Sequence, residues 1–148
     1  MQLNETIEFY TKASSMALKR MYNHMGAEYG VTQTIGFVLV YIAKEGISPG
    51  KLSEKLEMKK SSLTRLLNNM EKEGCIYKQS DPTDKRITKL FLTEKGLARR
   101  KIAKVAVLGF NEKIMNQVSD DELDAFIKVS KIITNEVEKI VEQENKHI

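Results

Sequence analysis

The sequence predicts a mainly α-helical chain with one small β-hairpin. Apolar residues recur at spacings of three and four through most of the 148 residues, which is typical of helices packed on one side. The window 76–92 is instead rich in β-branched and aromatic residues, which favour strands. Only two prolines and eight glycines interrupt the chain. We therefore expect residues 1–148 to form one mainly α domain with a hairpin.

The first two helices are expected on either side of Gly30. The first runs from an N-cap at Asn4 to about Glu28. Its apolar residues follow helical spacing: Leu3, Ile7, Tyr10, Ala13, Ala17, Met21 and Met25. Thr32 is placed to cap a second helix that Gly46 stops.

Two shorter helices follow. Ser48 and Pro49 are typical of an N-cap followed by proline at the first helical position, and they open a helix carrying Leu52 and Leu56. The next helix is expected from Lys60–Ser61 to Gly74. Its apolar residues share one face: Leu63, Leu66, Leu67 and Met70. The opposite face carries short polar residues and one arginine: Ser61, Ser62, Thr64, Arg65, Asn68 and Asn69. Such side chains suit contacts with base edges.

A hairpin and two long helices complete the chain. Ile76–Ser80 and Ile87–Leu92 favour strands, and the turn-rich segment Asp81–Arg86 joins them. Thr93 is expected to cap a helix from Glu94 to Gln117. Ser119 and Glu122 form a capping box that opens the last helix.

These elements in this order describe a winged helix-turn-helix, with Thr32–Glu45, Pro49–Leu56 and Ser61–Glu73 as its helices and Ile76–Leu92 as its wing. Here the chain resembles the MarR family of bacterial transcriptional regulators. Three stretches carry the resemblance: Ser61–Gly74 running into Ile76, Asp81–Arg86, and Leu92–Gly96. The resemblance implies a DNA-binding lobe at 31–96, with dimerisation helices at 1–30 and 97–148.

The resemblance also implies that the helix Ser61–Glu73 enters the major groove of double-stranded DNA. Arg65 and Asn69 are then expected to contact base edges, while the remaining polar residues contact bases or phosphates: Ser61, Ser62, Thr64 and Asn68. Lys59 and Lys60 meet the backbone at the helix N-terminus. An alternative for Arg65 is an ion pair with Asp84 that braces the wing.

In the wing, the resemblance implies that Arg86 inserts into the minor groove. Lys85 is a second basic contact, and Asp81 and Asp84 shape the turn. The family commonly has arginine where this chain has Thr83. The wing should therefore bind phosphate more weakly, unless Lys85 takes the place of that arginine.

The outer helices carry apolar residues that would be exposed to solvent in a monomer: Leu3, Ile7, Tyr10, Ile133, Val137, Ile140 and Val141. The resemblance implies a homodimer on a pseudo-palindromic operator, more often a repressor than an activator. Many relatives bind a small-molecule effector, and five residues are candidates to line such a pocket: Tyr22, Met25, Tyr29, Phe37 and Tyr41. Ordinary core packing is the alternative for each.

Charge is unevenly distributed. The net charge is +4, with a basic surplus over 48–118 and an acidic surplus from 119 to the end. This pattern favours a polyanion-binding centre, although solvated helix faces would give it too. Arg99, Arg100, Lys101 and Lys104 are interpreted mainly as a solvated face, with phosphate contact as a secondary role.

Several function classes find no support in the sequence. No apolar run is long enough to span a membrane, and no signal peptide is visible, so we expect a cytoplasmic protein without a membrane partner. The single cysteine, Cys75, is interpreted as a small buried residue, and no metal-ligand spacing or cofactor motif occurs. Glycine-rich phosphate loops and hydrolase or metalloprotease motifs are also missing, so no enzyme is expected. A winged helix that binds protein instead of DNA is the remaining alternative.

Overall fold

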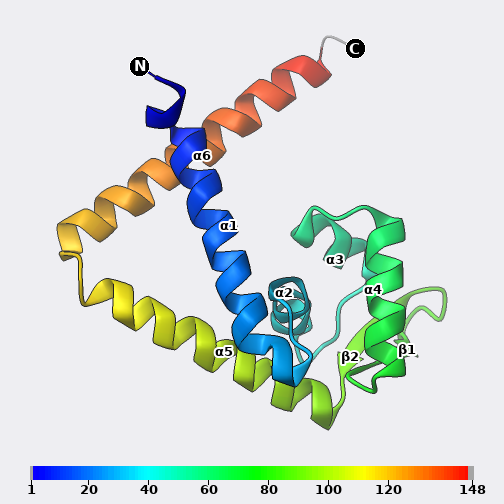
Figure 1. Ribbon diagram of the computed structural model, residues 1–148. Coiled ribbons are helices and arrows are strands. Elements are labelled where there is room, and N and C mark those ends of the chain that lie inside the picture. Colours follow the sequence, from blue (N-terminus) through cyan, green and yellow to red (C-terminus); the bar gives the residue numbers. More distant parts are fainter. Residues whose placement is uncertain (1, 147–148) are drawn as a thin grey trace. The chain divides into compact units, whose positions relative to one another are not determined.

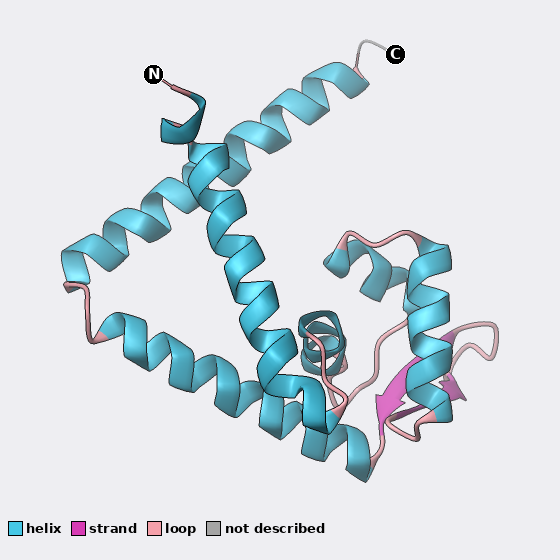
Figure 2. Cartoon of the chain, in the orientation of Figure 1, coloured by secondary structure: helices cyan, strands magenta, loops and turns pink. Residues whose placement is uncertain are grey.

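The computed structural model describes residues 2–146. The chain divides into two compact units, Met1–Ala106 and Val107–Ile148. Its elements are a 3₁₀ turn (Leu3–Glu5), α1 (Ile7–Gly26), a second 3₁₀ turn (Ala27–Tyr29), α2 (Gln33–Tyr41), α3 (Pro49–Leu56), α4 (Lys60–Lys72), β1 (Ile76–Ser80), β2 (Thr88–Leu92), α5 (Glu94–Met115) and α6 (Asp120–Asn145) (Figure 1). Figure 2 shows the two strands as one hairpin among helices. The predicted fold class is confirmed.

The core of the first unit lies between α2, α3, α4 and the hairpin. Its fully or almost fully buried side chains come from all of these elements: Val38, Leu39, Ile42, Ile47, Leu52, Leu63, Leu67, Met70, Cys75, Ile76 and Leu90. Because α4 gives three residues to this cluster, its apolar face is fixed against the core. The opposite, polar face of α4 is therefore held toward solvent.

The hairpin has a second backbone pairing, which the sequence did not predict. β1 and β2 are antiparallel, with Ile76 opposite Leu92 and Ser80 opposite Thr88. On the other edge of β2, Ile47 forms a bridge with Leu90, in which Leu90 N donates to Ile47 O at 2.8 Å. This short bridge ties the connection between α2 and α3 to the wing.

That bridge explains why α2 ends earlier than expected. The prediction extended the helix through Glu45, but it ends at Tyr41, and Ile42 is already extended with ψ of 92°. The chain must straighten and turn here to bring Ile47 alongside β2. Gly46 makes the turn with φ of +73°, and a Cβ at this position would lie 2.7 Å from Cζ of Phe91.

The helix starts follow the predicted caps with one exception. Thr32, Ser48 and Ser119 each accept a backbone N–H at the start of their helices. The predicted cap at Asn4 is wrong, because Thr6 accepts from Phe9 N and starts α1. Asn4 instead lies in the preceding 3₁₀ turn. In that turn Gln2 N donates a hydrogen bond to the Glu5 carboxylate.

The other helix ends differ by a few residues. α1 ends at Gly26 rather than Glu28, α4 at Lys72 before Gly74, and α5 at Met115 rather than Gln117. Offsets of one or two residues are ordinary for helix ends, which fray.

The second unit consists of the end of α5 and the whole of α6. The capping box at the start of α6 is complete, with Ser119 N donating to Glu122 and Glu122 N donating to Ser119. These bonds from Ser119 hold the pKa of Glu122 below its ordinary value. No residue of α6 is buried. Within the described residues, no helix has both the length and the hydropathy needed to cross a bilayer.

Candidate nucleic-acid interface

The exposed face of α4 is polar and contains no carboxylate along the six positions predicted to read DNA. Ser61, Ser62, Thr64, Arg65, Asn68 and Asn69 are all exposed, while Leu63, Leu67 and Met70 are buried. The alternative ion pair between Arg65 and Asp84 does not form among the residues that the structure describes. Asp84 instead accepts from the backbone N–H of Arg86 at 3.0 Å. The Arg65 guanidinium is therefore free to meet an anion or a base.

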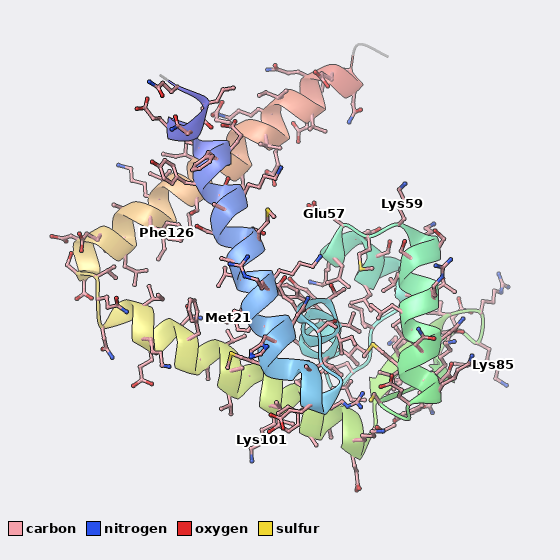
Figure 3. All side chains as sticks on the ribbon, in the orientation of Figure 1. Met21, Glu57, Lys59, Lys85, Lys101 and Phe126 are labelled. Carbon is pink, nitrogen blue, oxygen red and sulfur yellow. The ribbon has the colours of Figure 1, made fainter. Side chains whose placement is uncertain are left out.

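The start of α4 presents positive charge to solvent. Lys59 occupies the N-cap position but makes no side-chain cap hydrogen bond, so its side chain leaves the first backbone N–H groups uncovered. Lys59 and Lys60 are exposed, and Figure 3 shows Lys59 pointing away from the helix into solvent. Uncovered N–H groups at a helix N-terminus, together with the dipole and two lysines, favour an anion such as phosphate.

The wing turn is organised around Asp81. This carboxylate is 7% exposed and accepts from Thr83 N at 2.8 Å, from the Thr83 hydroxyl and from Asp84 N at 3.2 Å. It also forms an ion pair with Lys89 Nζ at 2.7 Å. The Lys89 ammonium, followed by the Thr83 donors, holds the pKa of Asp81 well below its ordinary value. The turn is therefore held by a buried carboxylate that accepts from the backbone and side chain of Thr83, from Asp84 N and from Lys89.

Thr83, the departure from the family pattern, has a structural contact in this chain. Its hydroxyl and its backbone N–H both donate to Asp81. The turn that it closes displays Lys85 and Arg86, which are exposed, and Figure 3 shows Lys85 extending from the wing into solvent. The positive charge of the wing tip is thus placed outward on an ordered turn.

Lys78, which the sequence did not single out, lies in strand β1 of the wing and reaches α4 with its side chain. Lys78 Nζ lies 2.9 Å from the Glu71 carboxylate and donates to Asn68 Oδ1 at 3.3 Å. Glu71 and Asn68 are three residues apart on α4 and so share one side of the helix. Strand alternation in the sequence could place Lys78 on one of two faces, but only the packing shows that its face is turned toward α4.

The end of α4 is fastened to the start of α5. The Thr93 hydroxyl accepts from Gly96 N at 3.1 Å, as its predicted role as a cap requires, and donates to Gly74 O at 2.6 Å. Lys95 Nζ donates to Glu73 O at 2.7 Å. These contacts join the last turn of the predicted recognition helix to the helix that follows the wing.

The interpretation of Arg99 and Arg100 as solvated was wrong. Arg99 Nη1 pairs with the Glu73 carboxylate and donates to Cys75 Sγ at 3.0 Å, and Glu73 is the main cause of the raised pKa of Arg99. Arg100 Nη1 donates to Ile42 O at 3.2 Å. Both arginines bind polar groups of other elements. Helical periodicity in the sequence does not reveal such long-range partners. Cys75 is fully buried, as predicted.

The five candidate pocket residues, Tyr22, Met25, Tyr29, Phe37 and Tyr41, differ in how far they are buried. Met25, Tyr29 and Phe37 are almost half-exposed, so ordinary core packing does not describe them within one chain. Burial raises the pKa of Tyr22, and Lys55 Nζ lies 5.3 Å above the centre of the Tyr41 ring.

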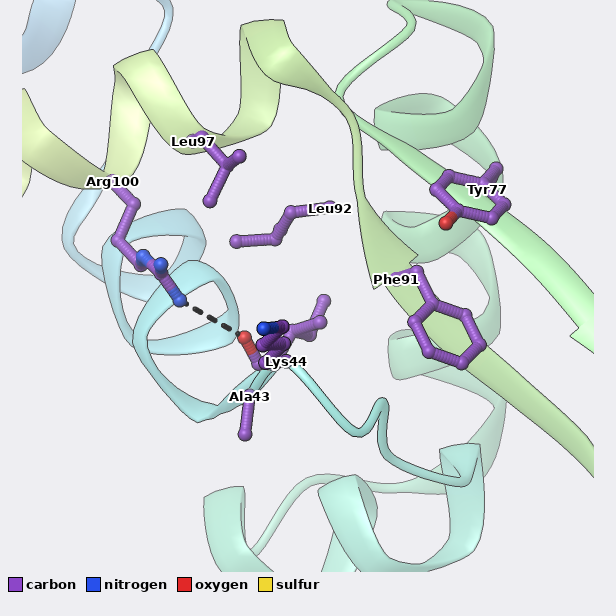
Figure 4. Close-up of a pocket in the computed structure, with 8 residues that line it drawn as sticks. Ala43, Lys44, Tyr77, Phe91, Leu92, Leu97 and Arg100 are labelled. Atoms are coloured by element: carbon purple, nitrogen blue, oxygen red, sulfur yellow. Dashed lines mark hydrogen bonds between the residues drawn. The ribbon is translucent and has the colours of Figure 1, made fainter.

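A hollow of about 380 Å³ lies elsewhere, where the end of α2, the base of the wing and the start of α5 meet (Figure 4). Its lining is Ile42, Ala43, Lys44, Tyr77, Phe91, Leu92, Leu97 and Arg100. The described part of the chain holds no cluster of three or more side chains suited to a metal ion.

A three-helix core, a two-stranded wing and a polar helix face turned outward together define a winged helix-turn-helix protein. Comparison with known proteins gives the family. The model of the MarR family matches residues 29–87. The transcriptional regulator SarZ of Staphylococcus aureus (strain USA300) is 30% identical over 112 residues, covering 74% of this chain and 76% of SarZ. PapX of Escherichia coli, an HTH-type transcriptional regulator, is 26% identical over 106 residues.

The match to PapX covers 70% of this chain but 65% of PapX, slightly less than two thirds. Among solved structures, the transcriptional repressor CouR bound to a 23-mer DNA duplex has a TM-score of 0.78 at 22% identity, covering 89% of this chain and 94% of CouR. CouR from Rhodococcus jostii RHA1 bound to p-coumaroyl-CoA has a TM-score of 0.79 at 20% identity, over 90% and 94%. The chain belongs to the MarR family of DNA-binding transcriptional regulators.

Proposed function

We propose that the chain is a cytoplasmic, ligand-responsive repressor that binds a pseudo-palindromic operator as a homodimer. In this proposal residues 31–96 form the DNA-binding lobe, and residues 1–30 and 97–148 form the dimer. The observation that carries the proposal is the outer face of α4, which is exposed, rich in short donors and acceptors, and free of carboxylates from Ser61 to Asn69. A protein-binding face would be expected to offer aromatic anchors there.

Within the major groove, Arg65 and Asn69 are the proposed base-reading residues. Arginine pairs with guanine and asparagine with adenine in bidentate geometry, and each good pair discriminates by about 1–3 kcal/mol. Lys59 and Lys60, with the N-terminal N–H groups of α4, would hold a phosphate and fix the register. The remaining polar side chains of this face, Ser61, Ser62, Thr64 and Asn68, would contact bases or phosphates.

The wing is proposed to hold the minor groove through Arg86, with Lys85 on the neighbouring backbone. A narrow A·T-rich minor groove strengthens the negative potential that attracts arginine. Asp81 and Asp84 do not contact DNA in this proposal. They shape the turn, because both accept backbone N–H groups of the wing tip.

Homodimer formation is supported by apolar side chains that remain uncovered in each unit. Leu3 is 88% exposed and Tyr10 60% in the first unit, and Phe126 is 68% exposed and Ile140 55% in the second. Large apolar side chains left this exposed on a helix are typical of an interface. A two-fold dimer would place two copies of α4 on successive major grooves, about one helical turn apart.

We further propose that a small molecule releases the operator by changing the separation of the two recognition helices. CouR has been solved both with DNA and with p-coumaroyl-CoA. Tyr22, Met25, Tyr29, Phe37 and Tyr41 remain the proposed lining, and several of them are partly exposed in one chain. Titrating candidate effectors against the affinity for the operator tests this step, and an affinity that no effector changes contradicts it.

Selecting bound sequences from random duplex DNA at near-physiological salt tests the proposed function. A recovered pseudo-palindrome with half-sites about ten base pairs apart supports both base reading and the dimer. Recovery of no motif, with retention that vanishes as salt rises, would leave only non-specific phosphate contact. That result would contradict the proposal and favour a winged helix that binds protein.

A further inference from the structure

Lys78 contacts Asn68 but not its neighbour Asn69, so the two asparagine side chains of α4 differ in their hydrogen bonding. Lys78 lies in β1 on the same face as the buried Ile76, since alternate strand residues share a face. β1 packs on α4, so this face is turned toward the helix. There Lys78 Nζ donates to Asn68 Oδ1 at 3.3 Å and pairs with the Glu71 carboxylate at 2.9 Å.

The contact favours one orientation of the Asn68 amide, with the oxygen toward Lys78. An ammonium group only donates hydrogen bonds, so it can hold the amide oxygen but not the amide nitrogen. With its oxygen turned to Lys78, Asn68 presents its NH₂ group to any ligand on the face of α4. Asn69 makes no such contact within the described residues, and its amide can present both the donor and the acceptor.

This difference matters for base recognition. Bidentate recognition of adenine by asparagine needs the amide oxygen to accept from N6–H₂ and the amide nitrogen to donate to N7. With its oxygen turned toward Lys78, Asn68 faces a base with its NH₂ group, so it is placed to donate to acceptors such as guanine O6 and N7 or thymine O4 and not to form the paired contact with adenine.

We propose that Lys78 is a positioning residue that excludes adenine from the base contacted by Asn68. The inference rests on the proposed function, in which α4 lies in the major groove. Lys78 acts from the wing through the amide of Asn68, and it also neutralises Glu71, a carboxylate beside the DNA-facing surface.

The test repeats the selection from random duplexes with two variants. Lys78→Met with Glu71→Gln removes the ion pair as a unit and leaves the net charge of the chain unchanged. Glu71→Gln alone is the matched control, because Lys78 can still hold Asn68. Exposed ion pairs add little to stability, so urea unfolding of both variants should match that of the parent.

We expect the double variant to gain adenine at one position of each half-site by about fivefold or more, near the lower limit for a bidentate contact. The Glu71→Gln control should keep the parental motif. In an Asn68→Ala background, the same double substitution should leave the motif unchanged, because the amide through which Lys78 acts is gone.

Two results would overturn the inference. One is a double variant that selects the parental base at every position. The other is an equal loss of affinity for all sequences with an unchanged motif, which would make Lys78 a phosphate contact instead. If the parent protein selects no motif at all, the proposed function itself is contradicted. This outcome differs from a failure of the inference about Lys78, because it is seen with the parent before any variant is compared.

Discussion

Replacing Thr93 with valine is expected to lower the free energy of unfolding by about 2 kcal/mol. The Thr93 hydroxyl makes two contacts: it accepts from Gly96 N at 3.1 Å and donates to Gly74 O at 2.6 Å. Loss of an N-cap costs about 1 kcal/mol, and loss of a further hydrogen bond costs about 1 kcal/mol. Valine has nearly the same shape, so little packing is lost beyond these two contacts.

The assay is urea unfolding of the parent, Thr93→Val and Thr93→Ser at one fixed protein concentration, because a dimer makes stability depend on concentration. Serine keeps the hydroxyl and both hydrogen bonds, so Thr93→Ser should stay within about 0.5 kcal/mol of the parent. If Thr93→Val unfolds like the parent, or if Thr93→Ser loses as much as Thr93→Val, the hydroxyl does not fasten α4 to α5.

Three further predictions concern the packing, the wing turn and the wing tip. Gly96→Ala should lower the free energy of unfolding by about 1–3 kcal/mol, since its Cβ would lie 2.0 Å from Cys75 O; Gly50→Ala, which meets open space, should raise it by about 0.5–1 kcal/mol. Because the pKa of Asp81 is lowered in the folded state, the stability that it adds is complete above its ordinary pKa near 4 and is lost as the pH falls below that value. Asp81→Asn should therefore lower the urea midpoint clearly at pH 7 and less at pH 3, and an equal loss at both would refute the ion-paired carboxylate. Arg86→Ala should weaken operator binding and reduce the slope of log affinity against log salt by about one; binding equal to that of the parent would remove Arg86 from the interface.

Local sequence signals predicted the elements and most of their starts. Thr32, Ser48 and Ser119 are caps because their hydroxyls accept helix N–H groups within three residues, an interaction that the sequence alone specifies. The buried and exposed faces of α4 follow from helical spacing in the same way. The hairpin strands were found because their composition changes abruptly after Gly74.

Long-range contacts could not be predicted in this way. The Ile47–Leu90 bridge joins residues more than forty positions apart, and it ends α2 before its apolar pattern ends. Helical periodicity predicts a solvated Arg99, because it does not reveal that Glu73 and Cys75 lie beside this side chain. Lys78 likewise acquires its contacts only when β1 packs on α4.

In the candidate site, too, features set by local sequence could be predicted and those set by tertiary contacts could not. Exposure of the polar residues on α4 was predictable from the period of one helix. The partners that fix the wing, above all Lys89 and Thr83 on Asp81, depend on how the turn folds back on itself. An aspartate in a turn-rich segment predicts a turn but not the ion pair that holds it.

The measurement that tests the central claim most directly is the affinity of the parent and of Asn69→Ala for two duplexes. One duplex carries the selected operator, and the other has the same composition in scrambled order. If α4 reads base edges, Asn69→Ala should weaken binding to the operator by about fivefold or more and leave binding to the scrambled duplex unchanged. An equal loss on both duplexes would contradict the account, because Asn69 would then contact only the phosphate backbone.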